Sequence, residues 1–247
     1  MDVWRNKLRN LEKESIDEQA RFFQQRFVFS LGDRFKEVQD VKDKFLAALK
    51  NDDGKDTLSA AGAAGFLQGL GLTRTALQRK AELQDVDVTG DGRTSFIEYL
   101  LLHFKILILE EHFKRKGTEP DVDMGNQGVG LTGVGDRLVE ELFSIPAGLD
   151  PELESLMQQF SVEHKKREDE IAELRRLVGE GGVKGMAAKS QLDSKLNEDQ
   201  SAMHAVEAKI ASAIKKAHKK AKDEMDAKAK LEEQAKAEAD AARKIKH

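Results

Sequence analysis

The stretch of sequence that decides the fold reads Asp87-Val-Thr-Gly-Asp91-Gly92-Arg-Thr-Ser95-Phe-Ile-Glu98. Oxygen-bearing side chains recur through its twelve positions. Ca²⁺ prefers about six to eight oxygen ligands, and a loop of this length supplies them from positions 1, 3, 5, 7, 9 and 12. The predicted ligands are the carboxylates of Asp87, Asp91 and Glu98, the hydroxyls of Thr89 and Ser95 (the latter through a water), and the backbone carbonyl of Arg93.

The register of this loop follows from Gly92 and Glu98. A glycine at position 6 allows the sharp turn, and a glutamate at position 12 binds with both oxygens. A loop that began at Asp85 would place Phe96 at position 12, where it offers no ligand. Thr89 stands at position 3, where a carboxylate or amide is usual, so only three carboxylates face the ion. We therefore expect micromolar rather than nanomolar affinity.

A second loop of the same length begins at Asn51. Asn51 and Asp53 fill its positions 1 and 3, but Lys55 stands at position 5 and Gly62 at position 12. A lysine brings a positive charge where a carboxylate is needed, and the bidentate glutamate is missing. We predict that this loop binds no calcium and supports the other loop, with Leu58 lying where the two loops touch.

Apolar residues at helical spacing surround both loops and predict helices over 34–50, 60–71, 74–86 and 96–116. Helix–loop–helix therefore occurs twice. On these residues, 36–110 resembles an EF-hand pair of the calmodulin superfamily. The resemblance implies that the two halves fold together and that calcium can change the angle between helices and expose an apolar groove.

The rest of the chain divides by composition. All three prolines lie between 120 and 151, together with a cluster of glycines, and both residue types disfavour helix interiors. We predict an all-α protein of four parts. These are an N-terminal helix (1–33, helical over 2–31), the EF-hand pair (34–116), a Gly/Pro-rich linker (117–150) and a helical, coiled-coil tail (151–247).

The tail begins at Asp150-Pro151-Glu152, a good helix start because proline is favoured in the first turn and acid suits a helix N-terminus. Alternating spacings of four and three residues predict a heptad seam. The seam is Leu153, Met157, Phe160, His164, Arg167, Ile171, Leu174 and Val178. A second helix is predicted from about 186 to the end, with a stripe at Leu192, Leu196, Met203, Val206, Ile210 and Ile214.

Three arrangements of the tail remain open from the sequence. The second helix can fold back on the first as a hairpin, zip with another copy of the chain, or lie along a filament. The layout resembles swiprosin-like proteins, which place two EF-hands before a C-terminal coiled coil and act on actin. The resemblance implies a protein partner from the cytoskeleton.

Several classes of function find no support. The net charge of −4 gives no pull toward nucleic acid, no apolar run is long enough to span a membrane, and Met1 is not followed by a secretory signal. The absence of cysteine excludes thiolate chemistry. Gly128-Val-Gly-Leu-Thr-Gly133 has dinucleotide-fingerprint spacing but no preceding strand. We expect a cytoplasmic, cytoskeleton-associated protein without enzymatic activity.

Two functional hypotheses follow. In the first, the protein is a calcium-responsive adaptor, in which one working loop senses the ion and the helical arms hold a partner. In the second, it is a structural protein of the cytoskeleton or of a filament, in which calcium is modulatory.

Overall fold

Helices account for the regular structure of the described residues, and the predicted all-α fold class is confirmed. The structure is a computed structural model that describes residues 2–53, 55–69, 73–145, 151–197, 204–216 and 219. The chain divides into two compact units, Met1–Gly148 and Leu149–His247. None of the described helices is long and apolar enough to cross a membrane.

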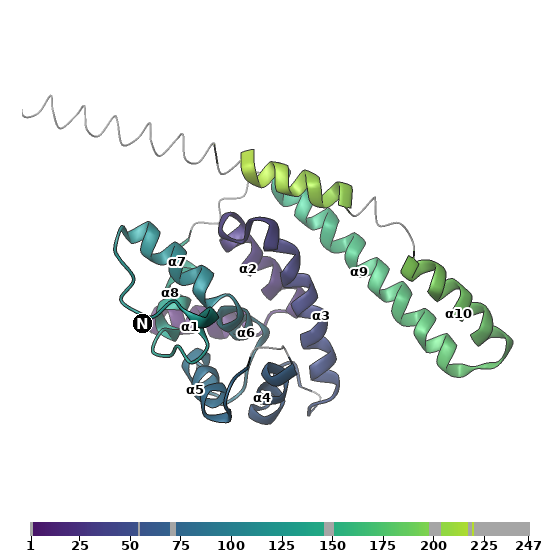
Figure 1. The fold of residues 1–247 in the computed structure, drawn as a ribbon, viewed down its shortest axis with the longest axis horizontal. Helices are drawn as coiled ribbons and strands as arrows, with labels where there is room; N and C mark the ends of the chain where they lie inside the picture. Colours follow the sequence, from purple (N-terminus) through teal and green to yellow (C-terminus); the bar gives the residue numbers. More distant parts are fainter. Residues whose placement is uncertain are drawn as a thin grey trace, which may run out of the picture. The chain divides into compact units, whose positions relative to one another are not determined.

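The first unit holds eight α-helices and two short 3-10 helices among its described residues (Figure 1). In chain order they are α1 (Asp2–Leu11), α2 (Ile16–Leu31), η1 (Gly32–Lys36), α3 (Glu37–Lys50), α4 (Ala60–Gly69), α5 (Ala76–Val86), α6 (Phe96–His103), α7 (Lys105–Lys116), η2 (Asn126–Gly128) and α8 (Gly135–Ser144).

Aromatic rings join the two helix–loop–helix halves of this unit. Phe45 of α3 lies fully buried, with its ring centroid 5.1 Å from that of Phe96 and 5.7 Å from that of Phe66. Phe66 of α4 in turn meets Tyr99 of α6 at 4.8 Å. Aromatic contacts of this kind add to the hydrophobic effect of burying the rings. They hold α3, α4 and α6 together beneath the two loops.

The helix predicted over 2–31 is interrupted at residues 12–15, so this prediction was wrong in detail. Ser15 caps α2, because its side chain accepts from the Glu18 backbone N–H while the Glu18 carboxylate accepts from the Ser15 N–H. Such a reciprocal box starts a new helix. The interruption turns the chain and brings Arg9 and Glu12 against the loop at 87–98.

The helix predicted over 96–116 is likewise divided, at Phe104, where the backbone leaves helical geometry (φ −101°, ψ 16°). The Phe104 ring is buried and lies 5.3 Å from that of Phe23. Packing of this ring against α2 therefore overrides the local helical pattern.

The segment predicted as a linker contributes to the first unit. Residues 135–144 form α8, and its Leu138, Val139 and Leu142 are buried. This helix packs on α1, α2, α5, α6 and α7. Its apolar residues follow helical spacing, so burial of one face stabilises a helix in spite of the surrounding glycines and prolines.

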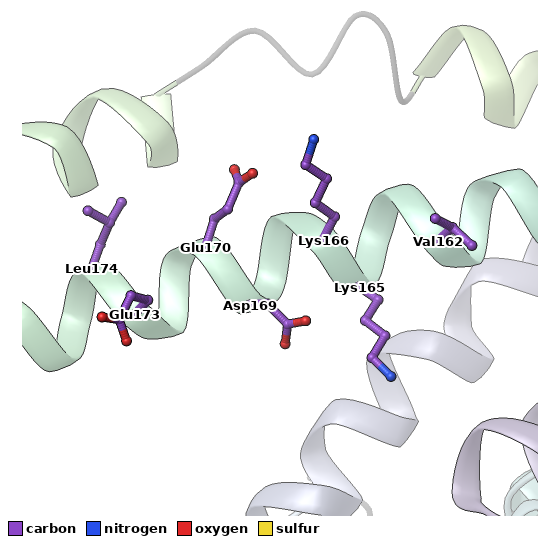
Figure 2. A pocket seen from close by; sticks show the side chains of 7 residues that line it. All are labelled: Val162, Lys165, Lys166, Asp169, Glu170, Glu173 and Leu174. Carbon is purple, nitrogen blue, oxygen red and sulfur yellow. The ribbon is translucent and has the colours of Figure 1, made fainter.

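The second unit contains α9 (Pro151–Glu180) and α10 (Gly182–Asn197), and residues 204–216 are also helical. Gly181 and Gly182 have positive φ (71° and 69°) and turn the chain between α9 and α10, which pack against each other. The hairpin is therefore the arrangement present in the described part of the tail. Helix 204–216 also runs beside α9 (Figures 1 and 2).

The predicted tail patterns are partly confirmed. Leu153, Phe160 and Ile171 of the seam are buried. In the second stripe, Val206, Ile210 and Ile214 are buried and Leu192 is half-buried, whereas Leu196 is 47% exposed. Met203 and the end of the predicted second helix lie outside the described residues.

Candidate metal centre

The loop at 87–98, here called loop 2, is shaped by two glycines and two aspartates. Gly90 and Gly92 adopt positive φ (75° and 73°), which glycine tolerates without steric cost. Asp87 Oδ1 accepts from the N–H groups of Gly90 and Asp91 at 2.8 and 3.1 Å, and its Oδ2 accepts from Gly92 N at 2.9 Å. The carboxylate of Asp91 accepts from Arg93 N at 2.8 Å. These bonds curl the loop around Asp87.

Ser95 and Glu98 form the start of α6. The Ser95 N–H and hydroxyl donate to Glu98 Oε2 at 2.9 and 3.0 Å, and Ser95 Oγ accepts from Glu98 N. The other oxygen, Glu98 Oε1, is buried without a hydrogen-bond partner. Burial, together with the nearby Glu12 carboxylate, raises the pKa of Glu98 well above its usual range. A buried carboxylate with a free oxygen is costly unless a cation or a proton meets it.

The six predicted site residues all belong to loop 2, but the structure does not bring all their ligand atoms together. Among the described residues, no three His, Asp or Glu side chains converge closely enough to hold a metal. Asp87 and Glu98 are engaged in the hydrogen bonds above. The Thr89 hydroxyl, at position 3, is buried without a partner. All the predicted ligand atoms are oxygens, and two of them, the Thr89 hydroxyl and Glu98 Oε1, have no hydrogen-bond partner. This set of residues therefore fits a hard cation such as Ca²⁺.

Loop 1, residues 51–62, meets loop 2 as the sequence predicted. The backbones of Leu58 and Thr94 exchange two hydrogen bonds of 2.9 Å, Leu58 N–H to Thr94 O and Thr94 N–H to Leu58 O. This bridge couples position 8 of each loop.

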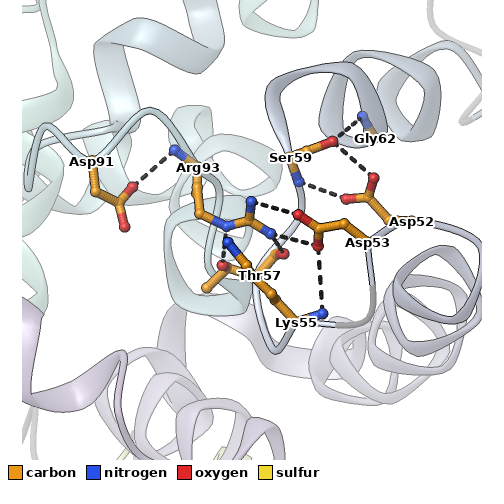
Figure 3. Close-up of polar contacts among 8 residues, drawn as sticks. All are labelled: Asp52, Asp53, Lys55, Thr57, Ser59, Gly62, Asp91 and Arg93. Atoms are coloured by element: carbon orange, nitrogen blue, oxygen red, sulfur yellow. Dashed lines mark hydrogen bonds and ion pairs between the residues drawn. The ribbon is translucent and has the colours of Figure 1, made fainter.

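The side chain of Arg93 provides a second link between the loops (Figure 3). Its Nη1 and Nη2 donate to the two carboxylate oxygens of Asp53, each at 2.9 Å. Its Nε donates to the Thr57 hydroxyl at 2.6 Å, and Nη2 also donates to the Thr57 carbonyl. Asp53 and Thr57 stand at positions 3 and 7 of loop 1, so the guanidinium binds two oxygens that a calcium-binding loop would turn toward its ion.

The Asp52 side chain joins the beginning of loop 1 to its end. Its carboxylate accepts from Ser59 N at 2.6 Å and from Ser59 Oγ at 2.8 Å, and Ser59 Oγ accepts from Gly62 N (Figure 3). A Cβ atom at Gly62 would lie 2.5 Å from Asp52 Oδ2. The glycine at position 12 therefore makes room for Asp52, and no side chain fits there without displacing it.

The glycine-rich stretch 128–133 binds α5, the helix that leads into loop 2. Asp85 of α5 accepts from the N–H groups of Gly133, Val134 and Gly135 at 2.8 to 3.2 Å, and Glu82 accepts from Gly130 N. No βαβ unit surrounds the stretch in the described chain. The backbone N–H groups of this stretch therefore make a structural contact with α5.

In the second unit, one side of α9 carries a shallow, open hollow lined by charged and aliphatic side chains (Figure 2). Its lining residues are Val162, Lys165, Lys166, Asp169, Glu170, Glu173 and Leu174. Glu170 also pairs with Lys195 of α10 at 2.7 Å, and Arg167 donates to the Lys195 carbonyl at 2.8 Å. This ion pair and this hydrogen bond hold α9 against α10 beside the hollow.

Two contacts around loop 2 were not predicted from the sequence. At Arg93 only the backbone carbonyl was assigned a role, and the side-chain bonds to Asp53 and Thr57 were not predicted. Glu12 was predicted to lie inside a continuous helix. The Ser15–Glu18 capping box marks the start of a new helix, and this signal would have placed Glu12 in the turn before it.

Comparison with known proteins gives one family. No curated protein and no solved structure matches the chain significantly. The family model described as F actin bundling C terminal matches residues 106–246, which is more than half of the 247 residues. The match begins in α7 of the first unit and continues through the second. The chain therefore belongs to the F actin bundling C terminal family.

Proposed function

We propose that this protein is a cytoskeletal protein that binds F-actin and holds one Ca²⁺ ion in loop 2. The observation that carries the actin part is the family match over residues 106–246. The described helices of the second unit, held in a hairpin, offer an elongated surface suited to a filament.

Support for calcium comes from the residues of loop 2. Asp87 directly follows α5 as its C-cap, and Glu98 lies in the first turn of α6. The hydroxyl of Thr89 and one oxygen of Glu98 are buried without partners. A bound Ca²⁺ would neutralise the carboxylates of Asp87, Asp91 and Glu98. Ligands from both ends of the loop would then fix α5 relative to α6.

Loop 1 is assigned a supporting role. Its Asp53 carboxylate and Thr57 carbonyl are bound by Arg93, and Asp52 fills the space next to Gly62. A second ion would have to displace a guanidinium that already neutralises the loop. We therefore propose one ion per chain.

The experiment is co-sedimentation of the full chain with F-actin in CaCl₂ and in EGTA. Pelleting with actin at high speed reports binding, and pelleting at low speed reports bundles. We expect the chain to pellet with actin at high speed, and its failure to do so in both buffers would overturn the actin assignment.

The same experiment separates the two hypotheses for calcium. A difference between CaCl₂ and EGTA that disappears in Glu98→Gln supports a calcium-responsive adaptor. Equal binding in both buffers supports the second hypothesis, a structural protein whose attachment to the filament is independent of calcium. Calorimetric titration of calcium tests the site itself: we expect one ion for the wild type and none for Glu98→Gln. Two ions per chain would contradict the assignment.

A further inference from the structure

The turn between α1 and α2 lies against loop 2. Arg9, near the end of α1, donates from Nη2 to the Thr89 carbonyl at 3.2 Å. Three residues later, Glu12 Oε1 accepts from the Ser95 hydroxyl at 3.1 Å. Arg9 at the end of α1 and Glu12 in the turn thus contact loop 2 at its positions 3 and 9.

Gln19 of α2 fixes this turn in place. The side-chain amide of this residue, which is only 2% exposed, donates to the carbonyls of Glu12 and Glu14 at 3.2 and 2.9 Å. Its oxygen accepts from Ile97 N at 2.9 Å. A single buried side chain therefore joins the turn to the first turn of α6. The position of Glu12 beside the loop is built into the fold.

The groups around Ser95 hold more acceptors than donors. Glu12 and Glu98 both face the Ser95 hydroxyl, which has one proton to donate. Glu98 is 1% exposed, and its Oε1 has no partner. Among the described residues, no Lys, Arg or His forms an ion pair with either carboxylate, and the charges of Asp87 and Asp91 lie near Glu12. A cation at this point would satisfy both carboxylates.

We propose that Glu12 supplies a fourth carboxylate to the ion held by loop 2. This inference rests on the calcium site proposed above. Position 3 of the loop carries Thr89 instead of a carboxylate, so the loop alone offers three charges. Glu12 restores the fourth from the neighbouring turn. Because affinity rises with the number of ligand charges, the site then binds more tightly than its twelve residues indicate.

The proposal also connects the ion to α1. Trp4, the single tryptophan of the chain, lies in α1 with its ring 6.1 Å from that of Phe143 in α8 and parallel to it. A ligand at the end of α1 would tighten the packing of that helix when the ion binds. Trp4 fluorescence therefore reports the event at a place remote from loop 2.

The test uses the full chain and four proteins: wild type, Glu12→Gln, Glu14→Gln and Glu98→Gln. Glu14 is the matched control, because it lies in the same turn and is exposed. Calcium is titrated by calorimetry, and Trp4 emission is followed in parallel. We expect calcium affinity to fall about tenfold or more in Glu12→Gln, to stay unchanged in Glu14→Gln, and to vanish in Glu98→Gln.

Thermal unfolding in EDTA separates a ligand from a structural residue. Removing one of two adjoining carboxylates should leave the unfolding midpoint of Glu12→Gln equal to or above that of the wild type. Calcium affinity equal to the wild type, or a lower midpoint in EDTA that accounts for the loss, would overturn the role of Glu12 alone. If the wild type itself binds no calcium, the site proposed for loop 2 fails as well.

Discussion

The guanidinium of Arg93 binds the carboxylate of Asp53 through two parallel hydrogen bonds of 2.9 Å, across a separation of 40 residues in the chain. The same residue stands at position 7 of loop 2, where its carbonyl is a predicted calcium ligand. One residue thus belongs to both loops, with its backbone in one and its charge in the other.

Arg93 should therefore stabilise the first unit without any ion. We expect the thermal midpoint in EDTA to fall in Arg93→Ala, because Asp53 and Thr57 lose their donor. Arg93→Lys should lie between the two, since an ammonium keeps the charge but cannot form the parallel pair. Circular dichroism melts of the three proteins test this order. Equal midpoints would show that the contact contributes nothing.

Glu141 of α8 provides a second test, because its buried carboxylate pairs with two residues of α7. Its carboxylate is fully buried and accepts two hydrogen bonds from Arg115, at 2.9 and 2.7 Å. A third hydrogen bond, of 2.9 Å, joins Glu141 Oε2 to His112 Nδ1. Glu141→Ala removes the hydrogen-bond partner of the buried His112 and of Arg115, whose side chain is 39% exposed, so it should cost about 2 kcal/mol of the free energy of unfolding. Urea unfolding followed by Trp4 fluorescence measures the change.

The control for this test is Glu140→Ala. Its partner Lys116 lies 3.7 Å away on the surface, and such pairs contribute little. We expect a change below about 0.5 kcal/mol. Similar losses at 140 and 141 would contradict the role given to burial.

Two glycines should respond in opposite directions to alanine. A Cβ at Gly135 would lie 1.8 Å from the Asp85 carbonyl oxygen, so Gly135→Ala should force α8 away from α5 and destabilise the unit by about 2 kcal/mol. Gly65 lies exposed in α4 with nothing within 4 Å of its Cβ position. Gly65→Ala should therefore stabilise the chain by about 0.5–1 kcal/mol. Chemical unfolding curves give both values, and a shared sign would refute the argument.

In the second unit, Ile210 tests the packing of helix 204–216. Its side chain is fully buried, whereas Ala208 on the same helix is exposed. Ile210→Asp buries a charge, and we expect lower helix content and weaker co-sedimentation with actin. Ala208→Asp adds the same charge to the surface and should leave the helix content unchanged. Loss of helix in both variants would assign the effect to the charge and not to burial.

Much of this architecture could be predicted from the sequence, because its signals are local. The turn of loop 2 depends on residues within a few positions of Gly92, and the contact of Leu58 with Thr94 follows from the equal lengths of the two loops. The apolar stripe that ends at Ile210 and Ile214 could also be predicted, because its residues follow helical spacing.

The features that the sequence did not disclose depend on partners far along the chain. The bond between Arg93 and Asp53 joins two loops, and the break at Phe104 depends on a ring in α2. The helix α8 was hidden by the glycines and prolines around it, although Leu138, Val139 and Leu142 have helical spacing. A continuous helix was predicted through Glu12 because helix-forming residues are frequent on both sides of it, and the capping signal at Ser15 was not used.

The position of α8 has a practical consequence for dissecting the protein. The family match begins at residue 106, but α7 and α8 bury Ile108, Leu109, Leu138 and Leu142 within a unit that also needs α1, α2 and α6. A recombinant fragment cut at the family boundary would expose these apolar faces to water and would tend to aggregate. Sedimenting aggregates would then mimic actin bundles in a pelleting assay. Truncation near residue 149 leaves the core of the first unit whole.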